Sequence, residues 1–184
     1  MSAKIRFRHT TETDVDFVLA TEQHLDNARF VVGWPRSRHL GCLQKADELH
    51  FILERTADAQ AVGYLIMAGL TNPNHNLELC RLVIADKGRG YGRAALRYAK
   101  QLAFETYNAH RLWLDLKVYN HRAKHLYEQE GFVAEGILRE CIKTEQGFES
   151  LLVMSILQAE YRQTLTSPLS AAGSVNPPNS HSNC

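Results

Sequence analysis

The sequence predicts a single α/β (α+β) domain, built on a mixed, mostly antiparallel and strongly twisted sheet of about seven strands with about four helices. Three observations predict this class. The chain has 184 residues, which is enough for one hydrophobic core but few for two. Short apolar or alternating segments, typical of strands, are separated by turn residues. Longer segments repeat apolar residues every three or four positions, which is typical of helices.

The first third of the chain is expected to hold one strand and two helices. Residues 5–8 form a short strand, and a helix follows at 13–23, capped by Thr13 with Asp16 three residues later. The segment ARFVVGWPRSRH mixes aromatic, glycine and proline residues, so it predicts a loop, which could frame a substrate mouth. A second helix is expected at 37–49.

Three strands and a helix are expected in the middle of the chain. Residues 50–55 and 61–70 are separated by the polar segment TADAQ, which indicates an antiparallel pair. Another strand at 77–84 leads through a glycine-rich loop into a helix that begins at Gly90. This strand, loop and helix form one structural unit.

The last third begins with a strand at 111–118 in which apolar and polar residues alternate strictly. Asn120 then caps a helix at 120–130, and two final strands at 132–141 and 148–157 flank a turn.

The end of the chain differs in composition from the rest. After Arg162 the sequence is rich in Ser, Pro and Asn and has little to bury. Residues 1–162 are therefore expected to form the domain, and residues 163–184 a disordered tail.

Charge and cysteine usage exclude several classes of protein. With 21 basic and 20 acidic side chains, the net charge of +1 gives no reason to expect nucleic acid or a membrane as a partner. The longest apolar segment, 61–70, is half as long as a bilayer span, and the N-terminus lacks the apolar core of a signal peptide, so a cytoplasmic protein is expected. The cysteines are far apart, and His121 and His125 lack a third ligand, so no metal site is expected.

A glycine-rich loop is the first candidate binding site. Gly88, Gly90 and Gly92 lie between a strand and a helix, where free backbone N–H groups and the helix dipole bind phosphate oxygens. The side chains around them are basic: Lys87, Arg89, Arg93 and Arg97. This combination suits a ligand with several phosphates, such as coenzyme A.

The same loop also imitates a dinucleotide-binding fingerprint. Gly90, Gly92 and Ala95 fit the pattern GxGxxA, and Asp115 follows about 20 residues later at the end of a strand. An NAD(P)-binding oxidoreductase is therefore an alternative, although other strands precede the motif. A Walker A loop is excluded because the GK[ST] sequence is missing.

Two longer motifs give the sequence a family resemblance. The first is LVIADKGRGYGRAAL, in which Lys87, Gly90 and Gly92 fit an Arg/Gln-x-x-Gly-x-Gly/Ala signature, with Lys87 in place of the usual Arg or Gln. The second is LWLDLKVYNHRAKHLYEQEGF, with a strand, Asn, helix, Tyr and Gly-Phe in order. With these motifs the sequence resembles the Gcn5-related N-acetyltransferases (GNAT), in the branch of ribosomal-protein N-terminal acetyltransferases and spermidine acetyltransferases. The resemblance covers about Lys4 to Tyr161.

The resemblance implies a GNAT fold and a binding track for acetyl-CoA. The loop amides would bind the pyrophosphate, and exposed backbone groups of the preceding strand would bind the pantetheine arm. The residues that it implies in cofactor binding are Leu82, Val83, Ile84, Lys87, Gly88, Arg89, Gly90, Tyr91, Gly92, Arg93, Asn120 and Lys124.

The resemblance also implies the catalytic residues. Tyr127 would protonate the departing thiolate, Asp115 is the first candidate for the base, and Glu78 is the second. A backbone N–H near Val83 would stabilise the negative oxygen of the thioester. An acceptor pocket could be lined by Trp34, Arg36, Arg38 and His39.

The expected reaction is direct transfer of an acetyl group from acetyl-CoA to a primary amine, with no covalent enzyme intermediate. The acceptor stays open among a protein N-terminus, a polyamine and other small amines. A homodimer is compatible with the sequence. A CoA-binding regulatory module without catalysis is the second alternative.

Overall fold

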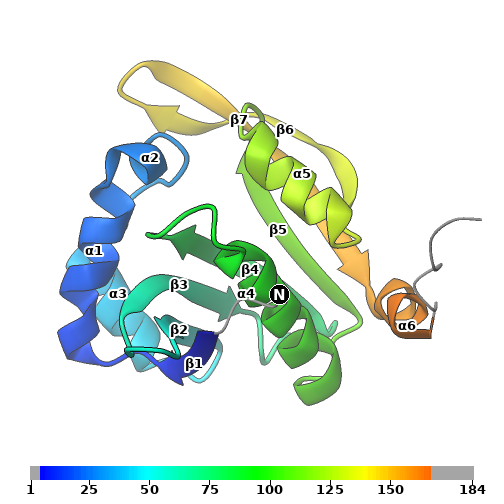
Figure 1. Cartoon of the computed structure of the whole chain (residues 1–184). Helices are drawn as coiled ribbons and strands as arrows, with labels where there is room; N and C mark the ends of the chain where they lie inside the picture. The colour runs from blue at the N-terminus through cyan, green and yellow to red at the C-terminus, as the bar shows by residue number, and fades with distance from the viewer. Residues whose placement is uncertain (1–4, 167–184) are drawn as a thin grey trace, which may run out of the picture.

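The sheet has seven strands in the order β1-β2-β3-β4-β5-β7-β6 (Figure 1). The computed structural model describes residues 5–166. In sheet order the strands are β1 (Ile5–His9), β2 (Glu48–Arg55), β3 (Ala61–Ala68), β4 (Asn76–Ile84), β5 (Arg111–Lys117), β7 (Gly147–Leu157) and β6 (Val133–Thr144). The helices are α1 (Val15–Gln23), α2 (Leu25–Ala28), α3 (Arg36–Leu43), α4 (Tyr91–Gln101), α5 (His121–Gln129) and α6 (Gln158–Thr166). A π-helical turn extends α4.

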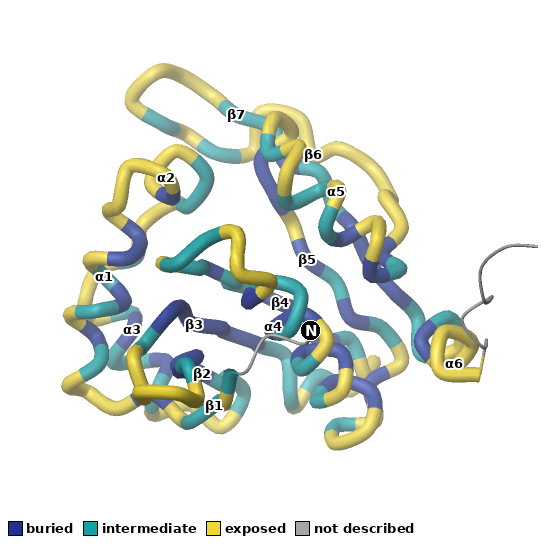
Figure 2. The backbone as a smooth tube through the Cα atoms, viewed as in Figure 1, coloured by how far each residue is buried: buried dark blue, intermediate teal, exposed yellow. Residues whose placement is uncertain are grey.

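Helices pack on both faces of the sheet, and each face has its own hydrophobic core. Leu96 of α4 and Leu65 of β3 belong to the larger core, which α5 and α6 also cover. Val18 of α1 and Tyr64 of β3 belong to the smaller core, which α3 also covers. Figure 2 shows the buried positions along the central strands, whereas the end of the β6–β7 hairpin is exposed.

The sheet opens between its two parallel strands. β4 and β5 pair only where Asn76 to Glu78 lie beside Arg111 to Trp113. Beyond that point β4 continues along β3 to Ile84, while β5 continues along β7 to Lys117. The two strands therefore diverge (Figure 1), and beyond Glu78 the edge of β4 that faces β5 has no strand partner within the described sheet.

The predicted class and the seven-stranded, mostly antiparallel sheet are confirmed, and every predicted strand overlaps one in the structure. The helix count was too low, because α2 and α6 were not predicted. Residues 163–166 of the predicted tail lie in α6, so the expected boundary after Arg162 falls within a helix. The rest of that tail, 167–184, lies outside the described residues.

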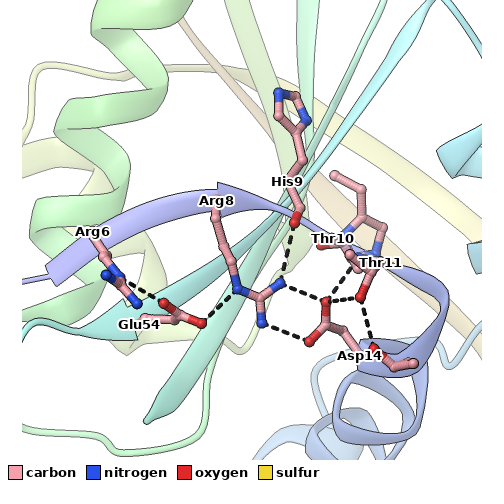
Figure 3. Close-up of polar contacts among 9 residues, drawn as sticks. Arg6, Arg8, His9, Thr10, Thr11, Asp14 and Glu54 are labelled. Carbon is pink, nitrogen blue, oxygen red and sulfur yellow. Dashed lines mark hydrogen bonds and ion pairs between the residues drawn. The ribbon is translucent and has the colours of Figure 1, made fainter. Parts of the chain in front are cut away.

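The predicted cap of the first helix was wrong by two residues. Asp14, and not Asp16, accepts hydrogen bonds from the backbone N–H and the hydroxyl of Thr11, both at 2.8 Å. Arg8 of β1 donates to the same carboxylate at 2.6 and 2.7 Å, and also to Glu54 of β2 (Figure 3). The bonds from Arg8 hold the pKa of Asp14 well below its usual value. Thr11 with Asp14 and Thr13 with Asp16 have the same spacing, so spacing alone does not choose between them, and the bonds from Arg8 favour Asp14.

The second predicted helix was too long at its C-terminal end. α3 ends at Leu43, and β2 begins at Glu48. Between them Asp47 accepts hydrogen bonds from the backbone N–H groups of Gly69 and Thr71, at 3.2 and 2.7 Å. The segment expected as the last helical turn therefore holds the connection between β3 and β4.

Candidate active site

Two clefts open where β4 and β5 diverge. One has a volume of about 520 Å³ and is bordered by the glycine-rich loop; we call it the glycine-loop cleft. The other has a volume of about 510 Å³ and contains Glu78 and Asp115; we call it the carboxylate cleft. Both clefts are lined by Phe30, Val31, Leu82, Val83, Asn120 and Tyr127. A ligand in one cleft can therefore reach a ligand in the other at this junction.

The glycine-rich loop follows β4 and ends where α4 begins. Gly88 and Gly90 have φ angles of 82° and 80°, in the left-handed region that favours glycine. Tyr91 is the first residue of α4, so the free N–H groups of this eleven-residue helix lie beside the loop. The loop and the helix start together can bind an anion without any side chain.

Basic side chains add to this anion site. Lys87 and Arg93 line the glycine-loop cleft as predicted, and Arg29 and Arg122 line it as well. Lys87 donates to the carbonyl of Asp26 at 2.8 Å. Burial lowers the pKa of Lys87, and the charges of Arg122 and Arg29 lower it further, because both arginines lie near Lys87.

Sequence reasoning missed Arg29 and Arg122. Arg29 follows α2, and Arg122 lies in the first turn of α5. Their only signal in the sequence is positive charge, because neither is near the glycine motif along the chain. The fold brings both to the same cleft.

Two of the residues predicted to bind the cofactor do not line the glycine-loop cleft. Arg89 is exposed and lies 3.7 Å from Asp86. Lys124 lies 3.6 Å from Glu128, one helical turn further along α5. The other predicted cofactor residues line this cleft: Leu82, Val83, Ile84, Lys87, Gly88, Gly90, Tyr91, Gly92, Arg93 and Asn120.

Tyr127 lies at the junction of the clefts. Its ring is buried and packs against Phe132, with ring centroids 5.8 Å apart. No residue between 5 and 166 makes a hydrogen bond with its hydroxyl. Burial, and then the charge of Asp115, raises the pKa of Tyr127 to about 12. The hydroxyl therefore stays protonated at neutral pH and can serve as a proton donor.

Asn120 lies beside Tyr127 at the same junction, at the start of α5. Its side-chain oxygen accepts a hydrogen bond from the backbone N–H of Ala123 at 3.2 Å, so Asn120 caps the helix as predicted. The cap fixes the side chain where both clefts meet.

Three acidic residues line the carboxylate cleft: Glu48 on β2, Glu78 on β4 and Asp115 on β5. Glu48 is paired with Arg38, so Glu78 and Asp115 are the two without a cation partner among the described residues. Burial raises the pKa of both carboxyl groups, and the charge of Asp115 raises that of Glu78 further, whereas the charge of Arg81 partly lowers both. Neither carboxylate has a cation within 4.0 Å in the part of the chain that the structure describes. A carboxylate with a raised pKa is suited to accept a proton from an amine.

The other charged groups around the carboxylate cleft are paired. Arg38 donates to both oxygens of Glu48, at 2.7 and 2.9 Å. Lys117 lies 2.8 Å from Glu149. The unmatched charge in this cleft is therefore negative.

Two of the four residues expected around an acceptor pocket line the carboxylate cleft, and two do not. Trp34 and Arg38 line the carboxylate cleft, and the Arg38 guanidinium lies 4.2 Å from the centre of the indole ring. Arg36 instead pairs with Asp16 on the surface, and His39 is fully buried behind the cleft.

Comparisons with solved structures show which class has this fold. A mutant form of the spermidine/spermine N-acetyltransferase SpeG from Vibrio cholerae is 21% identical, with a TM-score of 0.77 over 89% of this chain and 99% of that chain. A dodecameric structure of spermidine N-acetyltransferase from the same organism is 22% identical, with a TM-score of 0.74 over 87% of this chain and 97% of that chain. The fold is that of the N-acetyltransferases.

Sequence comparison gives the family. The sequence model of the acetyltransferase (GNAT) family matches residues 19–132, more than half of the chain. A spermidine N(1)-acetyltransferase of Vibrio cholerae is 25% identical in an alignment 174 positions long that covers 88% of this chain and 97% of the relative. This chain belongs to the acetyltransferase (GNAT) family, and the resemblance seen in its two motifs is confirmed.

The alternative of a dinucleotide-binding oxidoreductase does not fit this fold. The dinucleotide fingerprint belongs to an open, mostly parallel sheet, whereas here β4 and β5 form the one parallel pair of the described sheet.

No cluster of three metal-binding side chains occurs in residues 5–166, and no helix among them is long and apolar enough to cross a membrane.

Proposed function

We propose that this protein binds acetyl-CoA in the glycine-loop cleft and transfers the acetyl group to a cationic primary amine in the carboxylate cleft. The observation that carries the proposal is the meeting of the two clefts at Tyr127, with two unpaired carboxylates on the acceptor side. The proposal places all catalytic residues in one domain, which includes α6 up to Thr166.

The cofactor would lie along the opening of the sheet. Backbone N–H groups of the glycine-rich loop and the start of α4 would hold the pyrophosphate, with Lys87, Arg93 and Arg122 around it. The free edge of β4 would bond the pantetheine arm as an added strand would. This path ends at Val83 and Tyr127.

The amine would approach from the carboxylate cleft. Asp115 or Glu78 accepts a proton from the ammonium group, and the neutral nitrogen attacks the thioester carbon. The carbon–sulfur bond breaks, and the sulfur takes the proton of the Tyr127 hydroxyl. The attacking nitrogen then loses its second proton, which restores the Tyr127 hydroxyl, so the products are the amide and free coenzyme A. The backbone N–H near Val83 stabilises the negative oxygen.

The charge of the acceptor follows from the charges in the cleft. Arg38 and Lys117 are already paired with carboxylates, so Glu78 and Asp115 are left to bind a cation. Spermidine, the substrate named for the relative from Vibrio cholerae, is such an amine and is the first acceptor to test. A protein N-terminus is the second.

The test is release of free thiol from acetyl-CoA across a panel of amines. We expect release with cationic amines, and much less with amino acids of the same length, because their carboxylates meet Glu78 and Asp115. Replacing both residues, as Glu78→Gln with Asp115→Asn, should abolish the preference. The matched control is Glu128→Gln, an exposed carboxylate on α5 that lines neither cleft. If none of the amines in the panel caused thiol release, the proposal would be overturned.

Several expectations accompany this proposal. A cytoplasmic location and independence from metals remain predictions, and undiminished thiol release after treatment with a chelator would support the second. The dodecamer belongs to the relative from Vibrio cholerae. For this chain, self-association remains a prediction that light scattering can test.

A further inference from the structure

A buried carboxylate lies behind the wall of the carboxylate cleft. Glu22 of α1 has a side chain that is 2% exposed, and it accepts hydrogen bonds from the Tyr64 hydroxyl at 2.5 Å and from the backbone N–H of Trp34 at 3.0 Å. Trp34 lines the cleft, but Glu22 and Tyr64 do not. Glu22 therefore contacts a residue of the cleft wall without lining the cleft itself.

Arg81 joins this carboxylate to the cleft surface. Its side chain lines the carboxylate cleft, and its guanidinium lies 4.6 Å from the centre of the Trp34 ring. Its Nη2 donates to the carbonyl of Val32 at 2.5 Å. Its Nε lies 3.9 Å from Glu22, the one carboxylate within 4.0 Å of Arg81 in the described range.

Arg81 is therefore the one cation of the cleft wall that depends on Glu22. The guanidinium of Arg38 has its own partner in Glu48, and Lys117 has Glu149. Without the charge of Glu22, the charge of Arg81 would be opposed mainly by Glu78 and Asp115, the two carboxylates that the amine needs.

We infer that Glu22 is a positioning residue for acceptor binding: it neutralises Arg81 and holds Trp34, so that a cationic amine reaches the carboxylate cleft without a competing positive charge. The inference rests on the proposed function, because it concerns the amine that this cleft receives. It adds a residue outside the cleft to the determinants of acceptor choice.

Glu22 carries its negative charge at neutral pH. Burial alone would raise its pKa, but the adjacent His39 ring, the hydrogen bonds from Tyr64 and Trp34, and the charge of Arg81 lower it below the usual value. His39 is itself buried, with its Nε2 3.4 Å from Glu22.

The test is Glu22→Gln, which keeps the size of the side chain and removes the charge. The KM values of amines with one and two positive charges are measured at saturating acetyl-CoA. A Coulomb interaction grows in proportion to the charge of the acceptor, so we expect KM to rise about threefold for the monocation and about ninefold for the dication. Turnover and the KM of acetyl-CoA should change less than about twofold, and added salt should reduce both rises.

The matched control is Glu130→Gln. Glu130 is also a buried carboxylate bonded to cations, with Lys100 and Arg97 at 3.0 Å and Arg93 at 3.3 Å, but it lines neither cleft. Because Arg93 lines the glycine-loop cleft, this control can change the KM of acetyl-CoA, and the amines are therefore compared at saturating acetyl-CoA. Loss of the Glu130 carboxylate disturbs packing between α4 and the end of α5, so its effect on KM should be the same for both amines.

A second variant should shift the ratio of the two KM values in the opposite direction. In Arg81→Gln the charge of Glu22 is left uncompensated behind the wall, so the KM of the dication should fall relative to that of the monocation. The inference is overturned if Glu22→Gln raises both KM values equally, or if the two variants shift the ratio in the same direction. Failure of the wild-type protein to acetylate any amine would instead overturn the proposed function.

Discussion

Replacing Tyr127 by phenylalanine removes the proposed proton donor with little other change. The ring packs against Phe132 and should keep that contact. The hydroxyl has no hydrogen-bond partner within residues 5–166, so its loss should change the free energy of unfolding by less than about 1 kcal/mol. The variant therefore separates chemistry from stability.

The expected loss is in turnover. A general acid contributes at least about a hundredfold to rate, which corresponds to about 2.7 kcal/mol in the activation free energy. The KM of acetyl-CoA should stay within about twofold, because the binding groups of the glycine-loop cleft remain. Since the pKa of Tyr127 is about 12, the hydroxyl of the wild-type protein stays protonated between pH 7 and about 10. No loss of turnover from deprotonation of Tyr127 is then expected in that range.

The assay is thiol release at saturating acetyl-CoA and spermidine, with thermal unfolding measured on the same samples. If spermidine is not accepted, the best amine of the panel takes its place. Turnover of Tyr127→Phe within about twofold of wild type, with an unchanged melting temperature, would refute the role of Tyr127 as the acid.

Three further predictions concern the framework of the site. In Gly63→Ala the new Cβ would lie 2.5 Å from the carbonyl oxygen of Val83, so β4 must shift and stability should fall by about 1–3 kcal/mol in thermal unfolding; an unchanged melting temperature would contradict this. Arg122→Ala should raise the KM of acetyl-CoA about tenfold with turnover nearly unchanged, and equal KM values would remove Arg122 from the phosphate site. Burial would raise the pKa of Glu48, but its hydrogen bonds, first of all the one from Arg38, lower that pKa from 4.5 to about 2. The pair of Glu48 and Arg38 therefore stabilises the fold above pH 4.5, and this contribution is lost as the pH falls towards 2. Glu48→Gln should therefore show a smaller loss of stability between pH 5 and 3 than wild type; an equal loss would show that the pair contributes nothing.

The sequence predicted those helices and strands in which apolar residues repeat at the spacing of a helix or a strand. β5 alternates strictly, and its apolar residues Leu112 and Leu114 are buried. α6 was missed because it depends on a distant contact, in which Tyr161 stacks on Phe104 and donates to Glu105 at 2.6 Å. No local pattern marks that contact.

The same limit applies to the candidate site. The glycine-rich loop and Tyr127 lie in continuous motifs, so the sequence was enough to find them. Arg122 reaches the site because α5 lies along the glycine-loop cleft, and Glu22 because α1 packs on β3 and β4. Their chemistry was visible in the sequence, but their position was not.

The central claim is that the two clefts hold the two substrates and meet at Tyr127. A crystal structure with coenzyme A bound tests it most directly. We predict the pyrophosphate against the backbone N–H groups of residues 88–92, and the sulfur beside Val83 at about 3 Å from the Tyr127 hydroxyl. A pyrophosphate bound elsewhere, or a sulfur that does not reach the junction with the carboxylate cleft, would contradict the account.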